Sequence, residues 1–357
     1  MAVLSEDQTL VRDAAREWTR DRAPVSALRA LRGTGQGFDP ALWREMGELG
    51  WTGVLIPEAQ GGSELGVAAL GLILAETGST LTASPLLAHS LGVLALTLSG
   101  SNALGAEHLP RLASGERTAV LAVDEGPHHA PDRVATRFED GRLNGSKRFV
   151  PDGMAADLLV VAAQGPQGPA LFLATTDAAG LQGRSRRLAD GRGWADIELV
   201  DVPAQPLGGP ETLAAVLDRA YALLAAEMLG AATAAFEMTL AYLKTRTQFG
   251  QLIGGFQALQ HRAAQMFTEL QLAQSCVEAA LAAADTGPTF PALASLAKAR
   301  ANDVLHRISN ETVQMHGGIG MTDEHDAGLY LKRARTTEAL YGSSSFHRDR
   351  YAQAHGF

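Results

Sequence analysis

The residues best suited to chemistry lie in two short stretches of the last third of the chain, Arg246 to Gln257 and Gln314 to Gly320. The guanidinium of Arg246 has a planar fork that matches a phosphate, and glutamine amides both donate and accept hydrogen bonds. Phe249 and Phe256 offer flat apolar surfaces. A bound nucleotide with a flat ring requires this mixture, because it presents phosphates, a polar ring edge and apolar faces.

A flavin dinucleotide is the ligand that these stretches favour. Gln248, Gln257 and Gln314 supply amides, and Gly317 with Gly318 would let the backbone come close to the ligand. Each residue alone has an ordinary structural explanation, as a solvated arginine, a core phenylalanine, a polar helix face or a glycine-rich helix end. The interpretation therefore depends on the combination and its spacing.

Three regions with different sequence patterns must position these residues. Helical periodicity runs from Glu6 to about Ala113, short β-type runs lie between about Ala119 and Pro203, and helical patterns return from about Glu211. We therefore expect an α+β, mainly α chain. It would have an N-terminal helical domain (residues 1–115), a middle β domain (116–205) and a C-terminal four-helix bundle (206–357).

Local patterns make this expectation specific. In the first region, the stripes Leu10–Ala14–Trp18 and Leu42–Met46–Leu49 predict buried helix faces, and Ser84-Pro85 predicts a helix start. In the middle region, Asp140-Gly141 and Asn144-Gly145 predict tight turns, because these residues tolerate positive φ. The expected strands cover residues 119–123, 133–138, 158–163, 170–175 and 196–200. The apolar seam of the bundle consists of Phe256, Leu259, Ala263, Met266, Leu270, Ala273 and Val277.

Composition narrows the possible partners and locations. The chain of 357 residues has 30 Lys and Arg against 39 Asp and Glu, a net charge of −9, which makes nucleic acid an unexpected partner. The single cysteine, Cys276, excludes an internal disulfide and is expected to be a buried structural thiol. The N-terminus lacks a signal-peptide pattern and no long uninterrupted apolar run occurs, so we expect a soluble cytoplasmic protein without a membrane partner.

The two C-terminal stretches, together with Trp43 to Gly53 and the Pro57 to Gly62 segment, resemble the acyl-CoA dehydrogenase family, and the likeness covers nearly the whole chain. The resemblance implies a homotetrameric or heterotetrameric flavoprotein with FAD in the C-terminal region and at the oligomer interface. It also implies an acyl-CoA substrate, oxidised to the 2,3-enoyl thioester, and an electron-transferring flavoprotein as the electron acceptor.

The resemblance also implies roles for individual residues. Arg246, Gln248 and Phe249 would reach the FAD of a neighbouring subunit. Ile253, Phe256 and Gln257 would line the dinucleotide, and Gln314 and Gly318 would approach its adenosine part. Gly317 and Ser343 would also bind the cofactor.

The catalytic base of the family is missing. The reaction needs a carboxylate that removes the α proton of the thioester. Alignment of the paired glycines places Tyr341 at the usual position of the glutamate, and Ala220 occupies the alternative position on the preceding long helix. A phenol with an ordinary pKa near 10 is a poor base. Glu227, about two helical turns beyond Ala220, is expected to be a structural or interface carboxylate rather than a replacement.

The middle region departs from the family as well. Asp124 to Pro127 and Phe149 to Pro151 stand where active members carry residues that contact the flavin ring. Such losses resemble the small subunit of two-subunit acyl-CoA dehydrogenases, for example those acting on pimeloyl-CoA or on steroid side-chain thioesters. In such assemblies a partner supplies the base while both chains frame the FAD sites.

Three functional hypotheses follow. The chain is one subunit of a heteromeric acyl-CoA dehydrogenase, or a non-catalytic assembly subunit, or a flavoenzyme of this fold with a different reaction. Other sites find less support. His128-His129 has no third ligand at a metal-binding spacing, so we expect a surface loop and no metal. His261, His316 and His347 are accompanied by no nucleophile motif.

Overall fold

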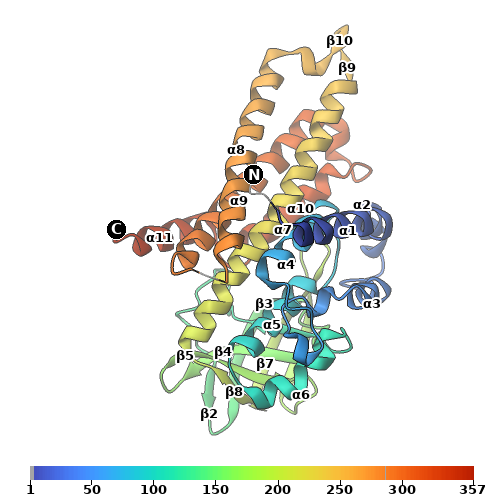
Figure 1. The fold of residues 1–357 in the computed structure, drawn as a ribbon. Coiled ribbons are helices and arrows are strands. Elements are labelled where there is room, and N and C mark those ends of the chain that lie inside the picture. The colour runs from blue at the N-terminus through green and yellow to red at the C-terminus, as the bar shows by residue number, and fades with distance from the viewer. Residues whose placement is uncertain (1–3, 286) are drawn as a thin grey trace. The chain divides into compact units, whose positions relative to one another are not determined.

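The computed structural model describes residues 4–285 and 287–357, and the described chain folds into two compact units. The first unit combines the residues up to Leu28, Gly71–Thr82 and Tyr221–Phe357. The second combines Arg29–Leu70 and Ala83–Ala220. The N-terminal helices are therefore shared between the two units, although the order of helices, strands and helices along the chain is the expected one (Figure 1).

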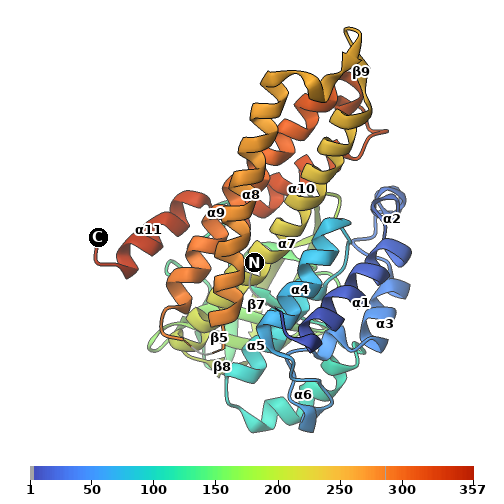
Figure 2. The same cartoon turned by 45° about the horizontal axis from the view of Figure 1, so that its top comes forward.

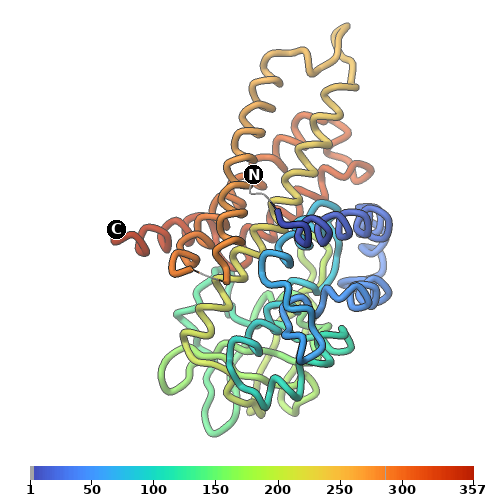
Figure 3. Tube along the Cα trace, in the orientation of Figure 1, coloured from blue at the N-terminus to red at the C-terminus, as the bar shows by residue number. Residues whose placement is uncertain are grey.

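The first unit is helical. Its long helices are α7 (Pro210–Thr245) from Tyr221 onward, α8 (Gln257–Ala283), α9 (Phe290–His316) and α10 (Ala327–Ala339). The chain rises through α7, turns, and returns through α8, which lies beside α9 (Figures 2 and 3). The unit also contains α1 (Glu6–Arg22), α11 (Ser344–Ala354), the short helix η4 (Gly317–Met321) and the end of α4 (Gly66–Ser79).

The predicted C-terminal bundle is confirmed. The seam of α8 is buried at Met266, Leu270, Ala273 and Val277 and half-buried nearer the start of the helix. α7 is long and apolar enough to cross a membrane by length and composition alone, but 61% of its apolar window is buried inside the protein. Burial of that kind is typical of a core helix.

α4 and α7 cross in very close backbone contact. A Cβ atom on Gly230 would lie 1.8 Å from the carbonyl oxygen of Ala75, and one on Gly78 would lie 2.1 Å from that of Glu227. Only glycine fits at both points, because any side chain would overlap the facing backbone. The two glycines therefore fix how these helices pack.

The second unit is built around a sheet of eight strands in the order β6-β7-β3-β2-β4-β5-β8, with β1 pairing parallel to β4. The strands are β1 (Ala119–Ala122), β2 (Arg137–Glu139), β3 (Arg142–Pro151), β4 (Leu158–Gly165), β5 (Gly168–Thr175), β6 (Leu181–Arg187), β7 (Gly193–Pro203) and β8 (Gln205–Gly208). Around it are the helices α2 (Val25–Leu31), α3 (Pro40–Glu48), η1 (Trp51–Gly53), η2 (Glu58–Gln60), α5 (Leu86–Leu98) and α6 (Asn102–Ala113).

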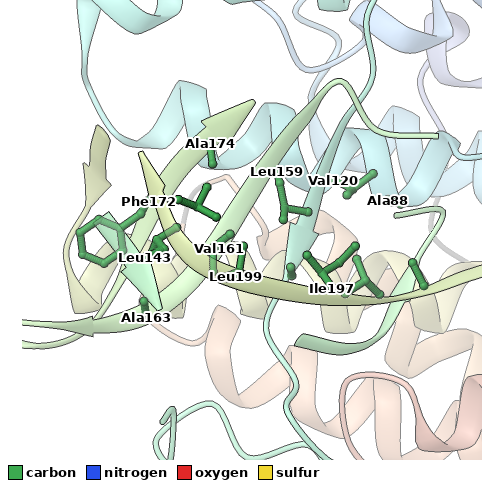
Figure 4. Close-up of a cluster of buried hydrophobic side chains, with 14 residues drawn as sticks. Ala88, Val120, Leu143, Leu159, Val161, Ala163, Phe172, Ala174, Ile197 and Leu199 are labelled. Carbon is green, nitrogen blue, oxygen red and sulfur yellow. The ribbon is translucent and has the colours of Figure 1, made fainter. Parts of the chain in front are cut away.

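The core of the second unit lies between this sheet and α5. Leu143 of β3, Leu159 and Val161 of β4 and Ile197 of β7 point into it (Figure 4). α5 approaches β1 so closely that a Cβ on Gly92 would lie 2.6 Å from that of Ala119. The hairpin between β2 and β3 turns at Asp140-Gly141, where both residues have positive φ, as predicted.

Some local expectations are wrong. Asn144-Gly145 is predicted to form a tight turn but is a β-bulge inside β3, where the pairing with β7 shifts. The Asn144 side chain is hydrogen-bonded to Asp201 there. β2 begins only at Arg137, and the Arg-rich β6 lies outside all of the expected runs. The residues of β6 are mostly polar and do not alternate with apolar ones, because this edge strand is largely exposed.

Two predicted helix stripes are also wrong. In α1 the buried residues are Ala15 and Thr19, one position after the expected stripe, and Leu10 is 68% exposed. In α3 the buried residues are Trp43 and Met46, while Leu49 lies beyond the helix end. Of the two predicted stripes, Met46 is the position that is fully buried, whereas Leu10 and Leu49 are exposed.

Candidate functional site

The stretch from Arg246 to Gln257 forms a hairpin where α7 passes into α8, and we call it the tip. β9 (Thr247–Gln248) and β10 (Gln251–Leu252) pair antiparallel. Phe249 and Gly250 between them have φ of 54° and 80°, as a two-residue type I′ turn requires. This turn leaves the Phe249 side chain 91% exposed.

The tip presents polar groups outward from a fixed backbone. Arg246 donates its N–H to Tyr242 and accepts from the Ile253 N–H, both at 2.9 Å, while its side chain is exposed. Gln248 and Gln257 are exposed as well. Ile253 is buried, and the half-buried Phe256 meets the Phe249 ring edge-on at 6.1 Å between centroids. The tip thus offers a cation, two amides and an aromatic ring to a neighbour.

The second stretch lies at the same end of the bundle. α9 ends at His316, whose ring stacks 4.4 Å from that of Tyr242, one turn before Arg246. Gln314, Gly317 and Gly318 are exposed. A Cβ on either glycine would meet nothing within 4 Å. The backbone here is therefore open to close approach by a ligand.

Ser343 lies apart from the other predicted flavin residues of the chain. It is the N-cap of α11, and its neighbour Ser344 donates to Asp303 at the middle of α9. His316 is 13 residues further along that helix, which corresponds to about 20 Å. The structure therefore brings the tip and the α9 end to one region and leaves Ser343 in another.

Both base positions are buried. Tyr341 is 2% exposed with a φ of 53°, and Ala220 is fully buried. The Tyr341 carbonyl accepts a hydrogen bond from His347 Nε2 at 2.9 Å. The next carbonyl, of Gly342, accepts from Lys298 Nζ and from Asn302 Nδ2, each at 3.2 Å. The main chain at the base position is thus held by three side-chain donors.

Lys298 is the unusual member of this group because it is fully buried. Its ammonium also donates to Asn302 Oδ1 at 2.6 Å and to the Thr337 carbonyl at 3.0 Å. Burial lowers the pKa of Lys298 to about 7, and the charge of Glu338 opposes that shift. The side chain therefore uses neutral acceptors rather than a close carboxylate.

Glu227 is committed to a structural interaction. Its carboxylate accepts from Arg333 Nη2 at 2.7 Å and from Nε at 3.1 Å, and both residues are buried. A buried carboxylate paired in this way is costly to separate from its partner. The expectation that Glu227 is structural agrees with this geometry.

In the middle region, acidic residues that stand near the family's ring-contact position are used internally. Glu125 accepts from Lys147 Nζ at 2.7 Å and from the Thr136 hydroxyl at 2.6 Å. The nearby positive charge of Lys147 and these hydrogen bonds outweigh burial and lower the pKa of Glu125. Asp124 pairs with His129 Nδ1 at 2.8 Å, so His129 is buried rather than in an exposed loop.

Phe149, at the position of the family's ring-contacting residue, is also covered. The Arg186 guanidinium lies 4.7 Å from the centre of its ring and is held in place by Asp196. The Phe149 N–H donates to Asp196 at 3.3 Å. The face of this ring is therefore occupied by a side chain of the same unit.

Several of these residues were not found by sequence reasoning. Lys298 could have been noticed, because it interrupts an Ala-rich stripe of α9 at a position where an apolar residue is expected. Arg333, Arg186 and His347 gave no such signal, since arginine and histidine are ordinary on helix and strand surfaces. Their roles depend on partners far away in sequence.

Comparison with known proteins identifies the class. The chain belongs to the acyl-CoA dehydrogenase family, because residues 5–116 match the acyl-CoA dehydrogenase N-terminal domain and residues 209–355 match the C-terminal domain. It is 32% identical over 340 residues to acyl-CoA dehydrogenase IpdE2 of Mycolicibacterium smegmatis, covering 95% of this chain and 96% of that protein. It is 31% identical to cyclohex-1-ene-1-carbonyl-CoA dehydrogenase of Geobacter metallireducens, covering 98% and 97% of the two chains.

Solved structures agree. The Tcur3481-Tcur3483 steroid ACAD G363A variant is 33% identical, with a TM-score of 0.92 over 98% of both chains. The ChsE4-ChsE5 complex from Mycobacterium tuberculosis has a TM-score of 0.92 at 24% identity, covering 99% of this chain and 98% of that one, which supports the fold. The predicted family, fold and FAD cofactor are thereby confirmed.

FAD, the cofactor of this family, fits one part of the chain better than another. The exposed arginine, amides and open glycines of the first unit are suited to the dinucleotide part of FAD. In the second unit, Phe149 under Arg186 and Asp124 beside His129 do not form an open wall for a flavin ring. The middle region of this chain therefore does not provide the walls that a reactive flavin ring would need.

Proposed function

We propose that this chain is one subunit of a heteromeric, FAD-dependent acyl-CoA dehydrogenase whose partner supplies the catalytic base. The observation that carries the proposal is a contrast between two parts of the chain. Arg246, Gln248, Phe249 and Gln257 of the tip are exposed, whereas the predicted base positions hold the buried Tyr341 and Ala220. A chain that keeps its contribution to a neighbour's cofactor and lacks its own base is suited to a shared site.

In this assembly the tip serves the partner's FAD. Arg246 would pair with the pyrophosphate and Gln248 would bond polar groups of the dinucleotide, while Phe249 covers an apolar face. Ile253 and Phe256, in the turn before α8, and Gln257, its first residue, would line the dinucleotide. Gln314 and Gly318 would approach its adenosine part, with Gly317 beside them. Ser343 stays a predicted FAD contact in the separate region at the start of α11.

The chemistry comes from the bound FAD, which accepts a hydride while a carboxylate of the partner removes the α proton of the acyl-CoA. The residues of this chain bind and orient the cofactor and exclude water from it. The relatives support a heterotetramer acting on a steroid-derived or other bulky acyl-CoA, since one related structure is a steroid enzyme named for two components. By likeness to the family, we also propose a cytoplasmic location and an electron-transferring flavoprotein as acceptor.

A non-catalytic assembly subunit is the second candidate, because the covered Phe149 ring favours a chain with no ring pocket of its own. The test uses the chain alone and co-expressed with a candidate acyl-CoA dehydrogenase-like partner from the same organism. Flavin absorbance and its anaerobic bleaching by a panel of acyl-CoAs are recorded for both samples. The proposal expects bleaching only in the complex. Bleaching by the lone chain, or a partner equally active without this chain, would overturn it.

A matched pair of variants tests the tip. Arg246→Ala should lower the flavin content of the complex at least about tenfold at limiting FAD, because a charge-assisted phosphate contact is lost. Lys244→Ala removes an exposed cation two residues earlier and should leave the flavin content unchanged. Equal flavin content in both variants would refute the role given to Arg246.

A further inference from the structure

A cavity of about 690 Å³ lies entirely within the second unit. Its walls are the loop from Arg32 to Pro40, the turn from Asp152 to Ala155 after β3, the end of β6 and the start of β7. None of the residues proposed for FAD lines it. Its volume lies in the range that holds a small organic ligand.

Close glycine contacts build the floor of this cavity. A Cβ on Gly37 would lie 2.7 Å from the Cα of Gly193, so the two backbones touch. Gly191 has a φ of 72°, and a Cβ there would lie 2.9 Å from Cγ of Arg32. Any side chain at Gly37 would therefore push the loop and the strand apart, and the side chains of Arg32 and Asp152 pack directly against glycines 191 and 193.

The cavity is cationic on an acidic protein. Arg32, Arg187 and Arg192 line it together with one carboxylate, Asp152. Arg187 is oriented by a hydrogen bond from its Nη2 to the Arg32 carbonyl at 2.9 Å. Among the residues of the lining the arginines outnumber the carboxylate, in a chain whose net charge is −9, and the buried Asp190 lies beside Arg192 and Trp194.

The remaining lining is largely apolar. Phe38, Pro40, Met154 and Trp194 contribute to the walls, and Met154 is 55% exposed at the edge. The Trp194 indole is fixed by its N–H, which donates to the buried Asp190 at 3.2 Å. A ligand that satisfies this cavity needs an apolar body as well as a negative charge.

We propose that this cavity binds a small amphipathic carboxylate, an acid group on a flat or branched apolar body, with Arg187 and Arg32 holding the acid. A guanidinium fork matches a carboxylate in geometry, and the apolar wall gains by covering the body. The site goes beyond the proposed dehydrogenase function, which requires no ligand at this position.

The period of a β-strand provides a matched control. Arg187 and Ser185 line the cavity, whereas Arg184 is exposed on β6 at a position that does not. The side chains of odd and even residues point to opposite faces of a strand. Arg187→Met and Arg184→Met therefore remove the same charge from one strand, inside and outside the cavity.

The test measures binding of 2-naphthoate and its uncharged analogue 2-naphthamide to the full chain by calorimetry, with quenching of tryptophan fluorescence as a second readout of Trp194. The proposal expects naphthoate to bind at least about tenfold more tightly than the amide, a difference of about 1.4 kcal/mol. Arg187→Met should abolish that difference and Arg184→Met should retain it. Equal binding of acid and amide, no binding of either, or equal effects of the two variants would overturn the proposal.

Discussion

At the scale of single residues, the position at which the sequence comparison predicts a base has a well-supported main chain. The carbonyls of Tyr341 and Gly342 are bonded by His347, Lys298 and Asn302. Of these donors, Lys298 carries the largest energetic consequence, because its ammonium is fully buried.

Lys298 should make stability depend on pH. The unfolded chain binds this proton with an ordinary pKa of 10.5, whereas burial lowers the pKa in the folded protein to about 7. The folded state therefore binds fewer protons between these values, and its free energy of unfolding should rise from pH 7 toward pH 10.5. Below pH 7 the burial penalty is fully present.

The measurement is urea unfolding of the native chain and of Lys298→Met across that pH range. The native chain should gain up to about 5 kcal/mol relative to the variant as pH rises, given about 1.4 kcal/mol per pKa unit. Lys332→Met, which removes a lysine with a 38% exposed side chain, is the control and should follow the native chain. Parallel pH curves for the native chain and Lys298→Met would contradict the prediction.

At the scale of elements, much of the fold could be predicted, because the apolar periodicity of a helix or strand is visible within a short stretch of sequence. The α8 seam, the Asp140-Gly141 turn and the start of α5 all followed from such patterns. The bulge at Asn144-Gly145 did not, since the same residues permit a turn or a bulge and only the β3–β7 pairing decides. The partners of Lys298 and Arg186 likewise depend on tertiary contacts.

The crossing of α4 and α7 provides a prediction for an element. Gly230→Ala should destabilise the chain by about 3 kcal/mol, because its Cβ would overlap the Ala75 carbonyl and force the two helices apart. Gly328→Ala, in the first turn of α10, places its Cβ in open space. That control should be neutral or stabilising by up to about 1 kcal/mol. Denaturant unfolding compares the two, and similar stability would refute the packing argument.

At the scale of the whole molecule, the end of the bundle is too apolar for a surface left in water. Phe249 is 91% exposed, Met321 79%, Leu252 48% and Ile319 44%. An exposed group of this kind favours a protein interface. The sequence predicted the residues of the tip through family likeness, whereas their exposure follows from the turn geometry and was visible only in the structure.

The exposure of Phe249 separates folding from assembly. Phe249→Ser should leave the melting temperature of the lone chain unchanged, since the ring covers little of its own subunit. It should weaken the complex with the partner by about 2 kcal/mol, as truncation of a central aromatic contact does. Leu10→Ser, at a 68% exposed leucine of α1, is the control. Sedimentation of titrated mixtures measures the affinity, and equal affinities for the two variants would oppose an interface at the tip.

The support beneath Tyr341 has a consequence for substitutions at this position. Because the donors grip the carbonyls of residues 341 and 342, the bend does not require any particular group to project from position 341. A change of side chain at position 341 would therefore leave these three main-chain hydrogen bonds in place. What a replacement must match instead is the space around it, because Tyr341 is only 2% exposed.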